Sequence, residues 1–457
     1  MSQPVEVSPS RGARSSGWRH LDAVSFLTLY LVLLFGVESR LVIQGLGAAG
    51  SPALIVGCAG FGWWSFYQAQ RPAPTGFGRQ PVRIALLAVL CAFLASYAAA
   101  MARPISPLEA GTAQIGMVSL LGCLGVALLA NDGVPTFARF DQLMGRLVFL
   151  GAALATLGIA QFIANDALIR SFTIPGLVAN APLGGLTLRS GFSRPFGTAL
   201  HPIEFGAVVT TVLPLAIAWA RRTTTLSLVV RWLPASLMGL SVMLSISRSA
   251  IVCGVAGMVI LASGWSAPAR RFLIAAVAVV VSVVAVAVPG MLGSLTDLFV
   301  SSGDDGSVQS RTGSYPLAFE FFQTAPWFGR GNSTFLPIYR IFDNQYLLLL
   351  VDVGLVGLLS VVALFVTGAT CARRARRRSD SPTAHEYGQG LFAAIGAGAL
   401  GLAFFDGFGF PMCNGVVFLV VGLAGALWRL ARDGEAHEAQ PFINLRHRLR
   451  LRRRAAA

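Results

Sequence analysis

The chain has 457 residues, of which 55% are hydrophobic and only 12% are charged, with a mean hydropathy of +0.68. Because soluble domains carry about 25% charged residues, this composition excludes an ordinary soluble fold and predicts an all-α integral membrane protein. The basic residues are 35 arginines, giving a net charge of +15, and their placement indicates membrane topology rather than binding to nucleic acid.

Long apolar runs of about the length needed to cross a bilayer predict about twelve transmembrane helices. In chain order, we expect them at 21–37, 46–68, 84–101, 113–130, 147–164, 204–220, 232–246, 249–265, 272–290, 345–370, 388–406 and 412–430. The short pair at 232–265 is the weakest part of this prediction.

The arginines orient these helices. If the N-terminus is cytoplasmic, 26 of the 35 arginines fall in cytoplasmic segments, as the positive-inside rule requires. Both termini are therefore expected inside, and two long loops outside, the second with a surface helix in "SRTGSYPLAFEFFQTAPW". The predicted division is a tail at 1–20, helices one to five at 21–164, a loop at 165–203, helices six to nine at 204–290, a loop at 291–343, helices ten to twelve at 344–430 and an arginine-rich tail at 431–457.

Four of the external arginines are candidates for an anion site. Arg189 and Arg194 lie in the first long loop, Arg248 in "SISRSA" between two spans, and Arg311 at the start of the surface helix. Guanidinium groups bind phosphate in bidentate fashion, so arginines that converge at a membrane boundary suit a lipid-linked pyrophosphate. Local pairing with carboxylates or lipid headgroups is the alternative for each of them. At span ends, such as Arg40, snorkelling is the natural account.

The stretch "IFDNQYLLLLVDVGLVGLL" places polar residues at the outer end of the tenth span. We expect Asp343 to cap this helix and to act as a general base toward a sugar hydroxyl, although capping alone is a sufficient reason for an aspartate there. Asn344 and Gln345 are expected to line the same sugar site. Asp352 projects from the opposite helix face and is expected to be a buried helix-packing group.

His201 and Glu204, at the head of the sixth span, are secondary candidates for the base. A lone histidine is more often a hydrogen-bonded structural group than a catalyst. No His/Cys cluster has the spacing of metal ligands and no glycine-rich nucleotide loop occurs. We therefore expect no metal and no cofactor.

Four segments in this order resemble the superfamily of O-antigen ligases and O-antigen polymerases: "FSRPFGTALHPIEFGAVVTTVLPLAIAW", "SISRSA", "SRTGSYPLAFEFF…PWFGRGNSTF" and "DNQYLLLLVDVGLVGLL". The resemblance covers about 190–360. It implies a metal-independent glycosyltransferase of the bacterial inner membrane that uses an undecaprenyl-pyrophosphate-linked oligosaccharide on the outer face. It also implies that Arg248 and Arg311, with Arg194 less firmly, hold the donor pyrophosphate.

The resemblance favours a polymerase for O-antigen, capsule or exopolysaccharide over a lipid-A ligase, because the ligases carry a histidine where this chain has Asp343. Its expected partners are membrane lipids and a flippase and a chain-length regulator of the same pathway. A twelve-helix secondary transporter is the alternative; it would show two similar six-helix halves with ionisable groups near the bilayer midplane. A lipid-linked sugar flippase would need basic groups deep in a central cavity.

Overall fold

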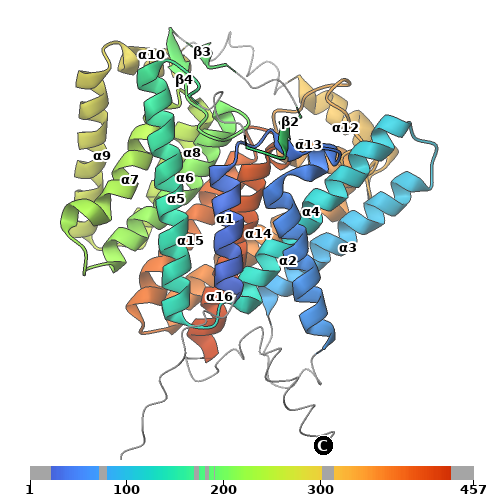
Figure 1. Ribbon diagram of the computed structural model, residues 1–457, viewed down its shortest axis with the longest axis horizontal. Helices are drawn as coiled ribbons and strands as arrows, with labels where there is room; N and C mark the ends of the chain where they lie inside the picture. The colour runs from blue at the N-terminus through green and yellow to red at the C-terminus, as the bar shows by residue number, and fades with distance from the viewer. Residues whose placement is uncertain are drawn as a thin grey trace, which may run out of the picture.

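The computed structural model describes residues 22–70, 80–168, 174–180, 185–189, 191–300 and 313–433. They form a helical bundle (Figure 1), which confirms the predicted all-α class. The α-helices are α1 (Ala23–Gly36), α2 (Pro52–Ala69), α3 (Pro81–Met101), α4 (Pro107–Gly133), α5 (Phe137–Ala164), α6 (Pro202–Arg222), α7 (Leu228–Leu244), α8 (Arg248–Ser263), α9 (Ala267–Ala287), α10 (Met291–Val300), α12 (Ser314–Thr324), α13 (Gln345–Asp352), α14 (Gly354–Arg378), α15 (Pro382–Gly401) and α16 (Pro411–Asp433).

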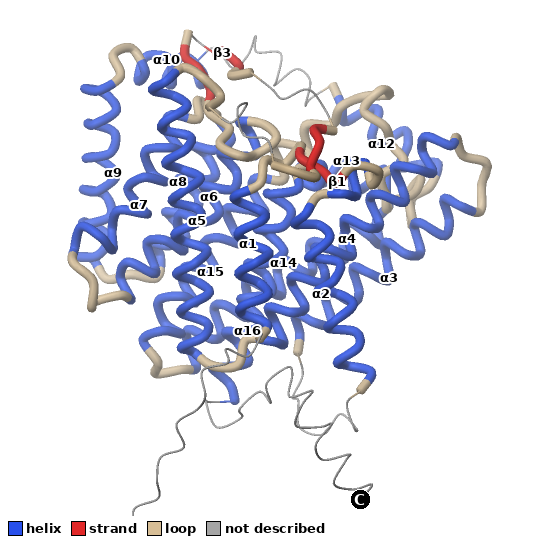
Figure 2. Tube along the Cα trace, in the orientation of Figure 1, coloured by secondary structure: helices blue, strands red, loops and turns tan. Residues whose placement is uncertain are grey.

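Short 3₁₀ helices and strands complete the described chain: η1 (Gly47–Gly50), η3 (Gly407–Gly409), β1 (Leu41–Ile43), β2 (Leu177–Ala179), β3 (Thr187–Arg189) and β4 (Phe192–Arg194). The strands pair antiparallel as β1–β2 and β3–β4. Figure 2 shows strands β1 and β3 and the longer connections at one end of the bundle. We call this the loop end; the opposite end, which carries the α6–α7 and α14–α15 turns, is the arginine-rich end.

In the described ranges, seven helices are long and apolar enough to cross a membrane: α3, α4, α5, α6, α9, α14 and α16. The apolar helices α1, α7 and α8 are shorter, so the predicted total of twelve spans stays a prediction. Helices α6 and α16 are central: 89% and 94% of the residues in their most apolar stretch are buried. The corresponding share in α9 is 11%, and this helix lies at the edge of the bundle (Figure 1).

Local sequence explains where the helices begin. Proline occupies the first turn of α2, α3, α4, α6, α9 and α15, where its missing N–H costs no hydrogen bond. At α4, Ser106 and Glu109 form a reciprocal capping box, which satisfies two otherwise unpaired backbone N–H groups.

The predicted tenth span is divided. The sequence predicted one helix over 345–370, but the chain breaks between α13 and α14, where Gly354 has φ +67°. A Cβ at this glycine would lie 2.5 Å from the carbonyl carbon of Trp327, so the break is set by a close approach of the loop. Leu355 N–H donates to Pro326 O at 2.8 Å and Arg330 N–H donates to Val351 O at 2.9 Å.

Asp352 holds this loop in place. Its buried carboxylate accepts the backbone N–H groups of Ser333 and Phe335, each at 3.0 Å. The expectation of a buried structural group was therefore right, but its partner is the backbone of residues 333–335 and not another helix. A carboxylate suits this place because one oxygen can serve each donor.

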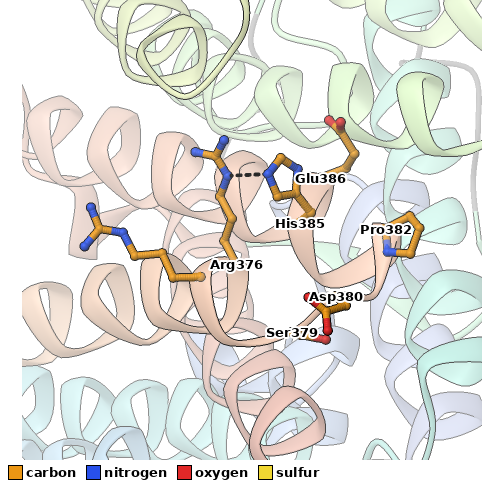
Figure 3. A pocket seen from close by; sticks show the side chains of 7 residues that line it. Arg376, Ser379, Asp380, Pro382, His385 and Glu386 are labelled. Atoms are coloured by element: carbon orange, nitrogen blue, oxygen red, sulfur yellow. Dashed lines mark hydrogen bonds between the residues drawn. The ribbon is translucent and has the colours of Figure 1, made fainter.

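The arginine-rich end is held by ion pairs between helices. Arg139 of α5 pairs with Asp22 before α1, and Arg221 of α6 pairs with Glu386 of α15 at 2.9 Å. Asp132, at the end of α4, accepts from Trp64 Nε1 at 2.8 Å. Arg376 of α14 donates to His385 of α15 across the turn between these helices (Figure 3).

Helices α2 and α4 meet through glycines, and one substitution tests this. A Cβ on Gly125 would lie 2.2 Å from Gly57 O, so the backbones touch. We expect Gly125→Ala to lower the free energy of unfolding by about 1–3 kcal/mol, measured by thermal denaturation in detergent. Gly111→Ala on the same helix is the matched control, since a Cβ there meets nothing within 4 Å. Equal stability of both variants would contradict this packing.

Candidate functional site

The candidate site lies at the loop end, where segments far apart in sequence come together. The β3–β4 hairpin pairs Thr187 with Arg194 and lies at the top of the bundle in Figure 1. The start of α6, the α7–α8 turn, the start of α13 and the loop 402–410 between α15 and α16 complete this end. Hydrogen bonds, ring contacts and charge interactions link these parts, as the following paragraphs describe.

Arg194 is the buried cation of the site. Its residue is 8% exposed, and its Nε donates to Ser245 O in the α7–α8 turn at 3.3 Å. Its Nη2 has no hydrogen-bond partner among the residues that the structure describes. Burial, with the charge of Arg189 adding to it, lowers the pKa of Arg194 to about 10, which still leaves the guanidinium charged at neutral pH. A buried charge of this kind is stabilised by a bound anion.

Arg248 is linked to Arg194 through the same turn. The turn between α7 and α8 is only three residues long, and Ser245, which accepts from Arg194, lies three positions before Arg248. Ser247 caps α8 by accepting the N–H of Ala250 at 3.4 Å, so Arg248 is the first residue of the helix. The structure thus brings two of the predicted anion-binding arginines to neighbouring places at the loop end.

Arg311 lies outside the described residues, so its predicted place in the site is not tested. Two other arginines of the loop end are held by this chain. Arg330 pairs with Glu109 at 3.2 Å, and Arg40 donates to Leu200 O at 2.8 Å. Arg40, which was expected to snorkel at a span end, therefore has a hydrogen-bond acceptor within the chain, in the loop before α6.

His201 caps α6. Its Nδ1 accepts the N–H of Ile203 at 3.2 Å, so the proton of the neutral ring belongs on Nε2. Burial, aided by the charges of Arg194 and Arg40, lowers the pKa of His201 to about 4. At neutral pH the imidazole is therefore an uncharged hydrogen-bond donor and a poor general base, since a base needs a pKa near the working pH.

Glu204 joins two helix starts. Its fully buried carboxylate accepts the N–H of Leu200 at 2.6 Å, Met412 at 2.7 Å and Cys413 at 3.2 Å. These donors belong to the approach to α6 and to the first turn of α16. Its hydrogen bonds make Glu204 a connector of central helices.

The start of α13 differs from the prediction by one residue. Asn344, not Asp343, is the N-cap, and its Oδ1 accepts the N–H groups of Tyr346 at 2.9 Å and Leu347 at 3.3 Å. Gln345 is buried and its Oε1 accepts the N–H of Phe408 at 2.7 Å. The expectation that Asp343 caps the helix is wrong, because the helix begins one position later. Its carboxylate is thereby left available for another role.

Asp406 is a neighbour of Asp343 to which the sequence assigned no role. It lies in the loop 402–410 and caps η3 through the N–H of Gly409 at 3.3 Å. Burial, with the negative charge of Asp343 adding to it, raises the pKa of Asp406 to about 6. The one sequence signal is an acidic residue in an aromatic and glycine segment, "FFDGFGF", between two apolar runs.

The loop 402–410 connects the carboxylate side of the site to the arginine side. Phe410 lies with its ring centroid 6.3 Å from that of His201 and 5.6 Å from that of Phe405. Gln345 N–H donates to Leu402 O at 2.8 Å. The loop therefore contacts both Gln345, which follows Asp343 and Asn344 in the chain, and His201.

The arrangement contains two arginines that suit an anionic group. It also contains a neutral hydrogen-bond donor, His201, and two neighbouring carboxylates, Asp343 and Asp406. Within the described ranges, no group of three or more His, Cys, Asp or Glu side chains is placed to hold a metal ion. Guanidinium groups such as those of Arg194 and Arg248 can bind an anion, and carboxylates such as those of Asp343 and Asp406 can transfer a proton.

Comparison with known proteins confirms the resemblance seen in the sequence. Residues 233–362 match the family model of the O-antigen ligase. The matched segment contains Arg248, Arg311 and Asp343 but neither Arg194 nor Asp406. No curated protein matches the chain. Together with the apolar helices, the match indicates a membrane protein and a glycosyltransferase-type enzyme of polysaccharide ligation or polymerisation.

Proposed function

Because residues 233–362 match the O-antigen ligase family, we propose that the protein polymerises or ligates an undecaprenyl-pyrophosphate-linked oligosaccharide. The reaction takes place at the loop end, which faces away from the cytoplasm across the bacterial inner membrane. The observation that carries the proposal is the buried guanidinium of Arg194, whose Nη2 has no hydrogen-bond partner among the described residues and whose Nε donates to the turn before Arg248. These arginines suit an anionic leaving group at a membrane boundary.

The donor pyrophosphate is bound by Arg194 and Arg248, with Arg311 as the third arginine of the site. Guanidinium groups that are already in place stabilise the negative charge that develops as the pyrophosphate leaves. The N–H on Nε2 of His201 supplies an uncharged donor beside them. Because the arginines balance the charge of the leaving group, the proposed reaction needs no metal.

Asp343 is the proposed general base. It accepts the proton of the acceptor hydroxyl, while the hydroxyl oxygen forms a bond to the anomeric carbon of the donor sugar. The bond from that carbon to the pyrophosphate oxygen breaks, and the electron pair leaves with the pyrophosphate. Attack from the opposite face inverts the anomeric configuration. Its freedom from the capping role and its position beside Asp406 support this assignment.

A polymerase is favoured over a lipid-A ligase, because the ligases that the sequence resembles carry a histidine at the position of Asp343. The test is deletion in the source bacterium, with analysis of its surface glycans and lipid-linked intermediates. A polymerase mutant loses the polymer and accumulates single lipid-linked repeat units. A ligase mutant accumulates finished lipid-linked polymer. Unchanged glycans would contradict both forms of the proposal.

The orientation of the bundle has its own test, motivated by 26 of 35 arginines falling on one predicted side. A reporter fused after residue 375 should be active as a cytoplasmic marker, and a reporter inserted near residue 305 should be active as an external marker. Activity of both reporters on the same side of the membrane would refute this topology. The candidate site would then not be on the outer face, where the proposed substrate is used.

Substitution of the arginines in the matched segment tests the pyrophosphate site. Arg248→Ala and Arg311→Ala should each abolish polymer formation while the protein level in membranes stays near wild type. The measurement is gel analysis of polymer alongside quantification of the protein. Wild-type polymer in either variant would remove that arginine from the site.

A further inference from the structure

A cavity lined partly by arginines lies at the arginine-rich end, opposite the loop end that carries the candidate site. It has a volume of about 460 Å³ and lies between α14 and α15. Its lining residues are Val366, Ala369, Thr370, Arg373, Arg374, Arg377 and Phe392. The six residues from α14 recur at intervals of three and four, so they share one face of that helix. Half of the lining of this face is apolar or hydroxyl-bearing and half is basic.

The apolar part of the cavity continues along α14. Leu359 is 55% exposed, Val362 38% and Val366 59%, and α14 is one of the helices long and apolar enough to span a membrane. In a bilayer this stripe contacts acyl chains. On the same helix face, the three arginines of the cavity follow this stripe. A lipid whose acyl chains lie on the stripe therefore places its headgroup beside these arginines.

The arginines of this helix end divide into two groups. Arg376 turns inward and donates to Gln389 and to the carbonyl of Gly264, and its contact with His385 is drawn in Figure 3. Arg378 lies 5.1 Å over the ring of Trp428. These two side chains are held by neighbouring helices.

The three arginines of the cavity have no carboxylate partner among the described residues. Arg377 also lines the adjacent cavity of Figure 3, together with Asp380 and Glu386, of which Glu386 pairs with Arg221. Arg373 lies 5.7 Å over the ring of Phe392. Three guanidinium groups within two helical turns repel one another unless an anion lies among them.

We infer that this cavity binds the headgroup phosphate of an anionic phospholipid from the leaflet at the arginine-rich end, with the acyl chains along the α14 stripe. Guanidinium groups suit a phosphodiester through charge-assisted hydrogen bonds. Basic cavities between membrane helices bind such headgroups. The apolar stripe favours a lipid over a soluble anion, because an inorganic phosphate makes no use of Leu359, Val362 or Val366.

The test uses the full-length protein in a neutral detergent, titrated with phosphatidylglycerol while its thermal stability is measured. The wild type should be stabilised, and R373Q/R374Q/R377Q should bind this lipid on the order of 100-fold more weakly. The matched control is R446Q/R448Q/R450Q, which removes the same charge from the C-terminal segment and should respond like the wild type. Phosphatidylcholine and inorganic phosphate should have little effect on any of these proteins.

A second variant keeps the test valid if the triple substitution does not fold. Thr370→Trp fills the cavity without changing any charge, and it should also weaken the response to phosphatidylglycerol. An undiminished response in the folded triple variant or in Thr370→Trp overturns the inference. Equal stabilisation by inorganic phosphate, or loss of the response in the control triple, overturns it as well, since the first indicates a soluble anion and the second a diffuse attraction.

Discussion

Replacing Arg194 by methionine is expected to lower the rate of polymer formation about 100-fold or more, the effect of removing one preorganised donor from a developing anion, without loss of stability. The guanidinium is buried and donates to Ser245 O, and its Nη2 has no hydrogen-bond partner within the described part of the chain. Burying such a charge without a partner costs free energy, so Arg194→Met should unfold at the same or a higher temperature than the wild type. The measurement is turnover of lipid-linked donor in vesicles beside thermal denaturation in detergent.

Arg330→Met is the matched control for this prediction. Arg330 also lies at the loop end, but its charge is used by Glu109 at 3.2 Å. Its removal leaves that buried carboxylate without its arginine, so stability should fall while activity per folded molecule stays close to wild type. If Arg194→Met is instead destabilised and retains its turnover, Arg194 is a structural residue and the proposed donor site is wrong.

The sequence did not predict that Arg330 would pair with a carboxylate and that Arg194, among the described residues, would not. Both are external arginines beside small residues, and the difference lies in what faces them. Glu109 is 221 positions away from Arg330 in the chain, and Ser245 is 51 positions away from Arg194. Spacing indicates helix faces, but it does not indicate which carboxylate a distant guanidinium reaches.

Helices were predicted where apolar runs and caps act locally. Apolar length predicts α3 and α5, which begin at Pro81 and after the capping side chain of Thr136. The break at Gly354 depends instead on the close approach of the Trp327 backbone. It also depends on the hydrogen bonds that Asp352 accepts from the loop before α13. The sequence around a glycine in an apolar run is the same whether or not a distant loop packs against it. The division of the tenth span could therefore not be predicted from the sequence pattern.

The two carboxylates of the candidate site, Asp343 and Asp406, illustrate the same limit of sequence patterns. The sequence placed a polar cap at the start of the tenth span, but Asn344 takes the role given to Asp343, because either residue caps well. Asp406 lies near Asp343 in a loop, 402–410, whose backbone Gln345 binds. A single substitution in this pair tests both the assignment and the proximity.

Asp343→Asn is expected to lower the rate of polymer formation by about 10²–10⁴-fold, the usual contribution of a general base. The substitution leaves the N-cap intact, because Asn344 provides it, so the protein should fold normally. Asp352→Asn, at the end of α13, is the matched control. Asp352 holds the N–H groups of Ser333 and Phe335, so its amide variant should lose stability and keep substantial turnover.

The same variant has a second readout, in the pH dependence of stability. The pKa of Asp406 is about 6 in the folded protein, above its ordinary value, so the folded state binds this proton more tightly than the unfolded state. Stability from this group is complete at low pH and is lost as the pH rises toward 6. Asp343→Asn removes one cause of the raised pKa, so the loss should occur at lower pH and the variant should be more stable above pH 6. Wild-type turnover in Asp343→Asn, with an unchanged pH profile of stability, would show that Asp343 is neither the base nor the neighbour of Asp406.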